Sequence, residues 1–120
     1  MEPLSENIEE NVDRFIVEAL NTGCVWALES EDGWALCPSE KFPQSDVMPF
    51  WSQPEFAQCH CVGEWSDYTP VAIALEELLD DWLPGMHKDV LLVGVNWNDK
   101  LEGIEVEPLD LLEEIETELR

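Results

Sequence analysis

The sequence predicts one α+β domain over residues 1–120, with about four helices and one mixed or mostly antiparallel sheet of about five to six strands. Three observations support this class. Helical spacings of apolar residues interchange with short β-prone runs, without strict strand–helix–strand alternation. A chain of 120 residues has the length of one ordinary domain. Hydrophobic residues make up 45% of the chain, which is enough for a packed core despite its many charges.

The first third of the chain predicts a surface helix followed by a hairpin. Apolar residues recur at helical spacing over 8–20, with Ser5 able to cap the start and Gly23 the end. Two β-prone runs then flank Asp32 and Gly33, a pair that suits a tight hairpin turn. Both faces of this hairpin are apolar, so we expect it to be covered on both sides.

The middle of the chain predicts two strands and two helices. VMPFW is a short strand that Pro49 restricts to a sheet edge or a strand start. Ser52 then caps a short helix. VAIAL is an uninterrupted apolar run, typical of a buried strand, and it leads into a helix over 76–83. Pro84 and Gly85 are expected to stop this helix.

The last third predicts a second buried strand, a turn, an alternating strand and a terminal helix. LLVGV is the buried strand, and residues 96–100 form the turn. In the strand that follows, Ile104 and Val106 point to one face and Glu105 to the other. An amphipathic helix begins at Pro108.

The charge excludes two classes of partner. The chain holds 28 acidic and 5 basic residues, a formal net charge of -23, so nucleic acid and anionic membranes would repel it. The N-terminus lacks the basic and apolar regions of a signal peptide, and the apolar runs are too short to span a membrane. We therefore expect a cytoplasmic protein whose four cysteines are reduced thiols.

Cysteine and histidine offer two candidate chemistries. Cys59, His60 and Cys61 are zinc-type ligands, but neighbouring positions on a helix point in different directions and structural zinc sites use longer spacers. We therefore favour one buried thiol, one exposed thiol and a surface histidine, and whether these residues bind metal stays open. A thiol–imidazole enzyme site could form only through the fold; its best residues are Cys37, Cys59, His60 and His87.

Paired carboxylates are abundant but lie on polar helix faces, as in Glu76 with Asp80, Glu77 with Asp81, and Glu114 with Glu118. A solvated face is the better interpretation for them than acid–base chemistry. The sequence contains no Gly-rich phosphate loop, no Asp-rich calcium loop and no nucleophile elbow. We therefore assign no catalytic residue, metal or cofactor.

Aromatic residues in the expected loops are the candidate binding residues. Rigid aromatic surface beside hydrogen-bonding groups is typical of protein interfaces, although the same rings could simply cover the ends of the sheet. The predicted partner-binding patch consists of Trp65, Asp67, Tyr68, Asn96, Trp97 and Asn98.

Several strings resemble one family. CVWALESEDGWALC, VMPFWS, WSDYTP and GVNWN, in this order and over nearly the whole chain from about Phe15, resemble the bacterial domain-of-unknown-function 2750 family. That resemblance implies a small, acidic cytosolic protein and supplies no activity and no catalytic residue. VMPFWSQPEF, VAIALEELL and the Asn-containing turn after LLVGV show a fainter similarity to the N-terminal domain of type III secretion regulators of the enhanced-serine-sensitivity kind. This similarity favours a non-enzymatic role.

Three functions remain after this reading. The leading hypothesis is a non-catalytic protein–protein interaction module with a partner that is a protein, and a basic one if charge drives the contact. A narrower alternative is a nucleic-acid mimic or immunity-type inhibitor whose carboxylates occupy a basic cleft of its target. The third is an uncharacterised enzyme with a Cys/His site. The sequence sets neither the partner nor the oligomeric state.

Overall fold

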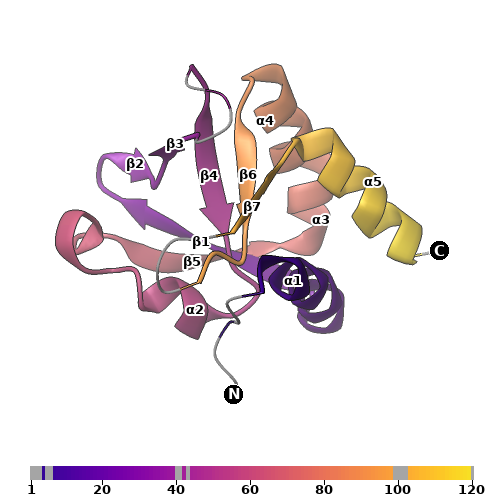
Figure 1. The fold of residues 1–120 in the computed structure, drawn as a ribbon, viewed down its shortest axis with the longest axis horizontal. Coiled ribbons are helices and arrows are strands. Elements are labelled where there is room, and N and C mark those ends of the chain that lie inside the picture. Colours follow the sequence, from indigo (N-terminus) through magenta and orange to yellow (C-terminus); the bar gives the residue numbers. More distant parts are fainter. Residues whose placement is uncertain (1–3, 5–6, 40–41, 43, 99–102, 120) are drawn as a thin grey trace.

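Four helices surround two sheets in the described part of the computed structural model, which covers residues 4, 7–39, 42, 44–98 and 103–119 (Figure 1). The elements in chain order are α1 (Ile8–Thr22), β1 (Cys24–Ser30), β2 (Gly33–Trp34), β3 (Cys37–Pro38), β4 (Asp46–Phe50), α2 (Pro54–Gln58), a 3-10 turn (Gly63–Trp65), β5 (Thr69–Ala74), α3 (Leu75–Glu77), a π-helical turn (Leu78–Trp82), α4 (Leu83–Lys88), β6 (Leu92–Val95), β7 (Ile104–Val106) and α5 (Pro108–Leu119). Because α3, the π-helical turn and α4 follow one another without a break, we call them together the 75–88 helix. The α+β class is confirmed.

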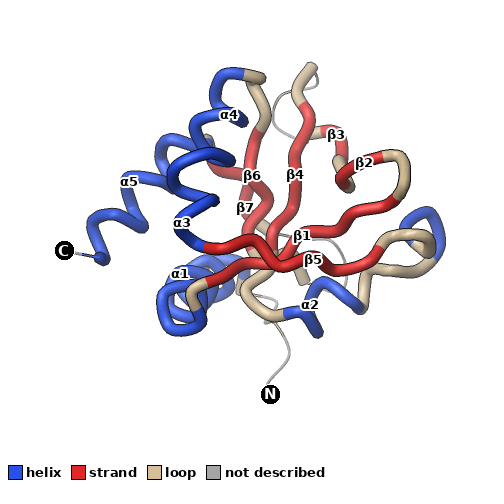
Figure 2. Tube along the Cα trace, turned by 180° about the vertical axis from the view of Figure 1, so that it is seen from behind, coloured by secondary structure: helices blue, strands red, loops and turns tan. Residues whose placement is uncertain are grey.

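The strands form two sheets, so the prediction of one sheet with about five to six strands is wrong. One sheet has three strands in the order β2-β1-β5, and all its pairs are antiparallel. The other has four strands in the order β3-β4-β6-β7 and is mixed, because β4 and β6 run parallel. The strands of the two sheets cross in direction, and the sheets meet near the start of β1 (Figure 2).

The strands divide into two sheets because β2 pairs with only the last two residues of β1. Glu29 and Ser30, at the end of β1, pair with β2. Further back along the same strand, Trp26 pairs with Trp51, the residue that follows β4. Both edges of β1 are therefore occupied, and the chain after β2 turns away to pair with β4 instead.

The first helix has the predicted span but a different cap. Ser5 lies outside the described residues, and the cap is Asn7, whose side-chain oxygen accepts from the backbone N–H groups of Glu9 and Glu10 at 3.1 and 3.2 Å. Gly23 ends α1 with a positive φ of 79° and donates its N–H to Ala19. The apolar stripe of the helix thus enters the core as predicted.

Strand β1 is packed on both faces, as the apolar pattern of the hairpin predicts. Val25 and Ala27 belong to the main core, which α1, the 75–88 helix and α5 cover. Leu28 belongs to a second core with Trp51 and Phe56. The first sheet therefore separates two hydrophobic clusters.

The second sheet accepts Pro49 although β4 is an inner strand of it. Pairing of β4 with β3 ends at Val47, and the bridge to β1 occurs at Trp51. Pro49 lies between these contacts, where its missing N–H leaves no ladder bond unmade. Its neighbour β6 is buried along its whole length, as predicted.

The prediction that VAIAL is a fully buried strand is wrong. β5 is an edge strand of the first sheet, and Ala72 and Ala74 are exposed while Ile73 between them is buried. Alanine is small enough to lie on either side of a sheet without much cost, so an alanine-containing run does not show that both faces are covered.

The prediction that Pro84 and Gly85 stop the helix is also wrong, because the helix continues to Lys88. The backbone N–H of Leu83 donates to the carbonyl of Leu78, five residues back. This π-helical turn takes up the disruption that proline causes in an α-helix, since Pro84 has no N–H to donate and its ring needs room. None of the helices in the described ranges combines the length and the apolar character needed to cross a membrane.

Candidate functional site

The turn after β6 is part of the interior. Asn96, Trp97 and Asn98 are 0, 5 and 2% exposed, and residues 99–100 of the predicted turn lie outside the described residues. Asn96 adopts a positive φ of 45°. Its Nδ2 donates to the carbonyl of Asn11 at 3.1 Å and to Ser52 Oγ at 3.0 Å, and its Oδ1 accepts from the Ser52 N–H at 2.9 Å. This half of the predicted patch would have to leave the interior to contact a partner.

Trp97 is enclosed by glycines. An added Cβ on Gly94 or Gly103 would lie 2.7 or 2.1 Å from its ring, so both positions are close backbone approaches that leave no room for a side chain. Its indole Nε1 donates to the carbonyl of Ile104 at 3.3 Å, and its own carbonyl accepts from Trp51 Nε1 at 2.9 Å. Trp97 therefore connects the end of β6 to β7 through its indole, and to Trp51 at the bridge between the sheets through its carbonyl.

A polar network extends from this turn to the surface. Ser52 Oγ donates to Glu18 Oε1 at 2.6 Å, and Arg14 Nε donates to Glu18 Oε2 at 3.1 Å. The Arg14 guanidinium lies 4.7 Å from the centre of the Phe56 ring. A serine that donates to a carboxylate resembles an activated nucleophile, but Ser52 is 0% exposed and no substrate can reach it. The network ties α1 to the ends of β4 and β6.

The other half of the predicted patch is more accessible. Trp65 and Tyr68 are half-buried, with ring centres 6.3 Å apart, and they pack against the second core. Asp67 between them is exposed. These three residues remain available to a partner, whereas the structure does not bring all six predicted residues onto one exposed surface.

Cys59, His60 and Cys61 diverge, as expected for consecutive positions at a helix end. The expectation of a surface histidine is wrong, because His60 is buried and stacks on Trp51 with ring centres 5.0 Å apart. Cys59 is the exposed thiol as expected, whereas Cys61 is half-buried, not buried. The Cys59 and Cys61 thiols donate to the carbonyls of Phe56 and Ala57 at 3.1 and 3.9 Å. Burial raises the pKa of the Cys61 thiol, and the neighbouring Cys59 raises it further. A thiol that keeps its proton is a poor nucleophile. Within the described ranges, no group of three or more His, Cys, Asp or Glu side chains could hold a metal ion.

The candidate enzyme residues do not meet in the cavities that we find along the described chain. His87 lies in a cavity beside β6 with Glu107, and Cys59 lies in a shallow one beside α2 with Glu55. A third cavity contains none of the four candidates, and Cys37 lies in β3. These cavities therefore bring no thiol and imidazole together.

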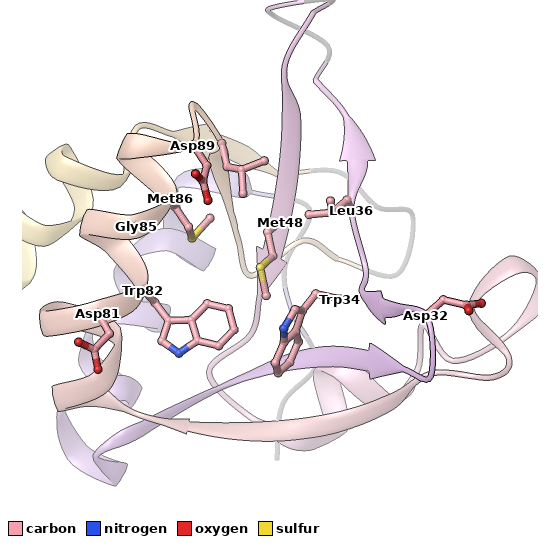
Figure 3. Close-up of a pocket in the computed structure, with 10 residues that line it drawn as sticks. Asp32, Trp34, Leu36, Met48, Asp81, Trp82, Gly85, Met86 and Asp89 are labelled. Atoms are coloured by element: carbon pink, nitrogen blue, oxygen red, sulfur yellow. The ribbon is translucent and has the colours of Figure 1, made fainter.

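That third cavity is the most aromatic of the three and lies between the 75–88 helix and strands β2 and β4 (Figure 3). Its volume is about 450 Å³, and we call it the Trp34–Trp82 pocket. It is lined by Asp32, Trp34, Leu36, Met48, Asp81, Trp82, Gly85, Met86, Asp89 and Leu91. The rings of Trp34 and Trp82 meet edge to face, with centres 4.9 Å apart and planes at 88°. The arrangement offers a surface that can bind an apolar or cationic group but holds no nucleophile.

In the sequence, Trp34 lies on an apolar face of the predicted hairpin and Trp82 on the apolar side of the predicted 76–83 helix, and neither pattern indicates this pocket. One signal could have suggested it, because Glu31-Asp32-Gly33-Trp34 and Asp80-Asp81-Trp82 each place acidic residues just before a tryptophan. Their meeting across the fold is a property of the tertiary structure.

Comparisons with known proteins place the chain in a family. Neither the curated proteins nor the solved structures yield a match. A protein-family model described as "Protein of unknown function (DUF2750)" matches residues 12–115. This match confirms the main resemblance found in the sequence, whereas the fainter similarity to type III secretion regulators is not confirmed. The chain belongs to the DUF2750 family of proteins of unknown function.

Proposed function

We propose that the protein is a non-catalytic module that binds a basic protein partner through two acidic helices. The supporting observation is the acidic helix pair, formed by the 75–88 helix and α5, which pack against each other through α4 (Figure 1). Its exposed carboxylates belong to Glu76, Glu77, Asp80, Asp81, Asp110, Glu113, Glu114, Glu116 and Glu118. Among the described residues of these two helices, Lys88 is the only lysine or arginine.

Two physical arguments connect this surface to a basic partner. Many like charges on neighbouring helices repel one another and destabilise the compact state. A small domain needs far fewer charges than this to stay soluble, so solubility alone does not account for them. A field of one sign accelerates encounter with a partner of opposite sign and disfavours wrong partners. A nucleic-acid mimic is the narrower form of this proposal, supported by the same rows of carboxylates, and its partner would release DNA when the protein binds.

The test compares two variants with equal net charge. One carries Glu113→Gln, Glu114→Gln, Glu116→Gln and Glu118→Gln on α5; the control carries Asp13→Asn, Glu31→Gln, Asp46→Asn and Glu55→Gln, which are exposed elsewhere. Each tagged protein is used for affinity purification from lysate of the source organism, followed by quantitative mass spectrometry. We expect a basic protein that binds the unmodified chain and the control, elutes with salt, and is lost from the α5 variant. Equal retention by both variants would reject the proposal.

A further inference from the structure

We propose that the Trp34–Trp82 pocket receives one arginine side chain of the partner protein, an inference that rests on the proposed function. The acidic helix pair would supply attraction over a distance, and this pocket would supply the contact that selects a particular residue. The pocket adjoins the helix pair because Asp81 belongs to both.

The aromatic lining suits a cation. Trp34 and Trp82 are half-buried and both border the cavity, so indole surface of each is available to a ligand. Of the aromatic side chains, tryptophan binds cations over its ring face best. Figure 3 shows Met48 next to the paired rings of Trp34 and Trp82, with Met86 further along the same helix as Trp82. An inserted cation would therefore lie between aromatic and thioether groups.

Charge at the edge of the pocket complements the same ligand. Asp32 comes from the turn between β1 and β2, Asp81 from the π-helical turn, and Asp89 from the end of α4. All three are exposed and line the cavity, although Asp32 is distant in sequence from the other two. In Figure 3 the Asp32 and Asp81 carboxylates lie at opposite ends of the pocket and point away from the two rings. A neutral apolar ligand would gain nothing from them, whereas they would attract a guanidinium to the pocket, where its plane can stack on an indole.

Arginine fits this combination better than lysine. Its planar, weakly hydrated head stacks on aromatic rings and forms several hydrogen bonds in fixed directions, whereas an ammonium is compact and strongly hydrated. Its apolar stem would contact Met48 and Met86, whose flexible side chains adapt to an inserted group. A cavity of about 450 Å³ lies within the usual range of ligand pockets and leaves room for one long side chain.

The backbone irregularity of the 75–88 helix lies directly at the pocket. The π-helical turn Leu78–Trp82 ends with Trp82, and Asp81 precedes it. Such turns are rare in helices and concentrate at functional sites. Here the turn supplies an aromatic and an acidic residue to the same cavity.

The first experiment uses short peptides as probes of the whole chain. N-acetyl-Gly-Arg-Gly-amide is titrated while the indole N–H resonances of ¹⁵N-labelled protein are followed by NMR. The comparison peptides carry lysine or citrulline, the latter being a neutral isostere of arginine. We expect saturable shifts of the Trp34 and Trp82 indoles with the arginine peptide, weaker shifts with lysine and none with citrulline. Equal response to citrulline, tighter binding of spermidine, or no shift at all would overturn the inference.

Matched variants then locate the binding. Asp81→Asn removes a carboxylate of the pocket, and Asp80→Asn removes its exposed neighbour outside it. Asp32→Asn and Glu31→Gln form a second pair on the hairpin turn, where Asn suits the Gly33 turn as well as Asp does. We expect each pocket variant to weaken arginine binding about two- to fivefold and each neighbour to change it less. Equal losses in both members of a pair would indicate diffuse attraction and reject the pocket.

The affinity purification separates failure of this inference from failure of the proposed function. If the partner is lost from the α5 variant but retained by a double Asp32→Asn and Asp81→Asn variant, the function stands and the pocket inference is wrong. If the pocket binds the arginine peptide selectively while no protein depends on α5, the pocket stands and the proposed function is wrong.

Discussion

Trp26 and Trp51 join the two sheets through their backbones. The N–H of Trp26 donates to the carbonyl of Trp51 at 2.7 Å, and the N–H of Trp51 donates to the carbonyl of Trp26 at 2.8 Å. Trp51 is 0% exposed, stacks on His60, and donates its indole N–H to the carbonyl of Trp97. The corner between the sheets therefore depends on one buried tryptophan that contacts both.

We expect Trp51→Phe to lower the free energy of unfolding by about 2–4 kcal/mol. The substitution leaves the buried Trp97 carbonyl without its hydrogen-bond donor, and the phenylalanine ring is too small to fill the space of the indole. Urea unfolding followed by circular dichroism measures the change. Trp26→Phe is the control, because Trp26 is half-buried and contributes to the bridge through its backbone alone. An equal loss in the control would show that the indole bond is unimportant.

Substitutions at Asn96 can separate its backbone from its side chain. Asn96→Ala removes the amide that serves Asn11 and Ser52, and alanine tolerates a positive φ less well than asparagine does, so we expect a loss of about 3–4 kcal/mol. Asn96→Gly removes the same bonds but fits the backbone, so its loss should be about 1 kcal/mol smaller. Equal unfolding free energies for the two variants in guanidinium would contradict a role for the backbone conformation.

Two glycines should respond in opposite directions to alanine. Gly94→Ala places a methyl group 2.7 Å from the Trp97 ring inside a buried strand, so we expect a loss of about 2–3 kcal/mol. Gly85→Ala lies in a helix with nothing within 4 Å of the added carbon, so it should gain up to about 1 kcal/mol. Thermal unfolding of both variants tests the pair, and a destabilised Gly85→Ala would be inconsistent with this packing.

Cys59 and Cys61 should react at different rates. Burial and the neighbouring Cys59 raise the pKa of Cys61, and the thiolate is the reactive form, so Cys61 should be alkylated more slowly than the exposed Cys59 at pH 8. The difference should narrow at higher pH. Because the folded chain holds the Cys61 proton more tightly than the unfolded chain, this group's contribution to stability is lost as the pH rises. Iodoacetamide labelling followed by peptide mass spectrometry measures both rates; faster labelling of Cys61 would refute the expectation.

Salt should stabilise the protein. With a formal net charge of -23, the carboxylates repel one another in the compact state, and added salt screens that repulsion. We therefore expect the melting temperature to rise between 10 and 200 mM NaCl and to rise less for the α5 variant, which lacks several of these charges. Differential scanning calorimetry provides the measurement. A melting temperature that does not change with salt would contradict the proposed repulsion between the carboxylates.

Local patterns were sufficient for several elements. The apolar stripe of α1 and its terminal Gly23 predicted that helix, and Asp32-Gly33 predicted the hairpin turn, because such signals act between residues close in sequence. The patterns failed at Pro84, where a π-helical turn lets the helix continue, and along VAIAL, where small side chains concealed an exposed face. Along VAIAL, which face the rest of the chain covers is decided outside the local window, whereas at Pro84 a local rearrangement of the helix replaces the expected stop.

The sequence by itself determined the acidic character, the α+β class, the positions of most elements and the family resemblance, because composition and short-range periodicity carry them. Only the tertiary structure decided that the strands form two sheets, that Asn96–Asn98 lie in the interior, and that Trp34 meets Trp82. Burial and contact between distant residues depend on how whole elements pack. The sequence alone therefore does not distinguish a buried tryptophan in a loop, such as Trp97, from one that lines a pocket, such as Trp34.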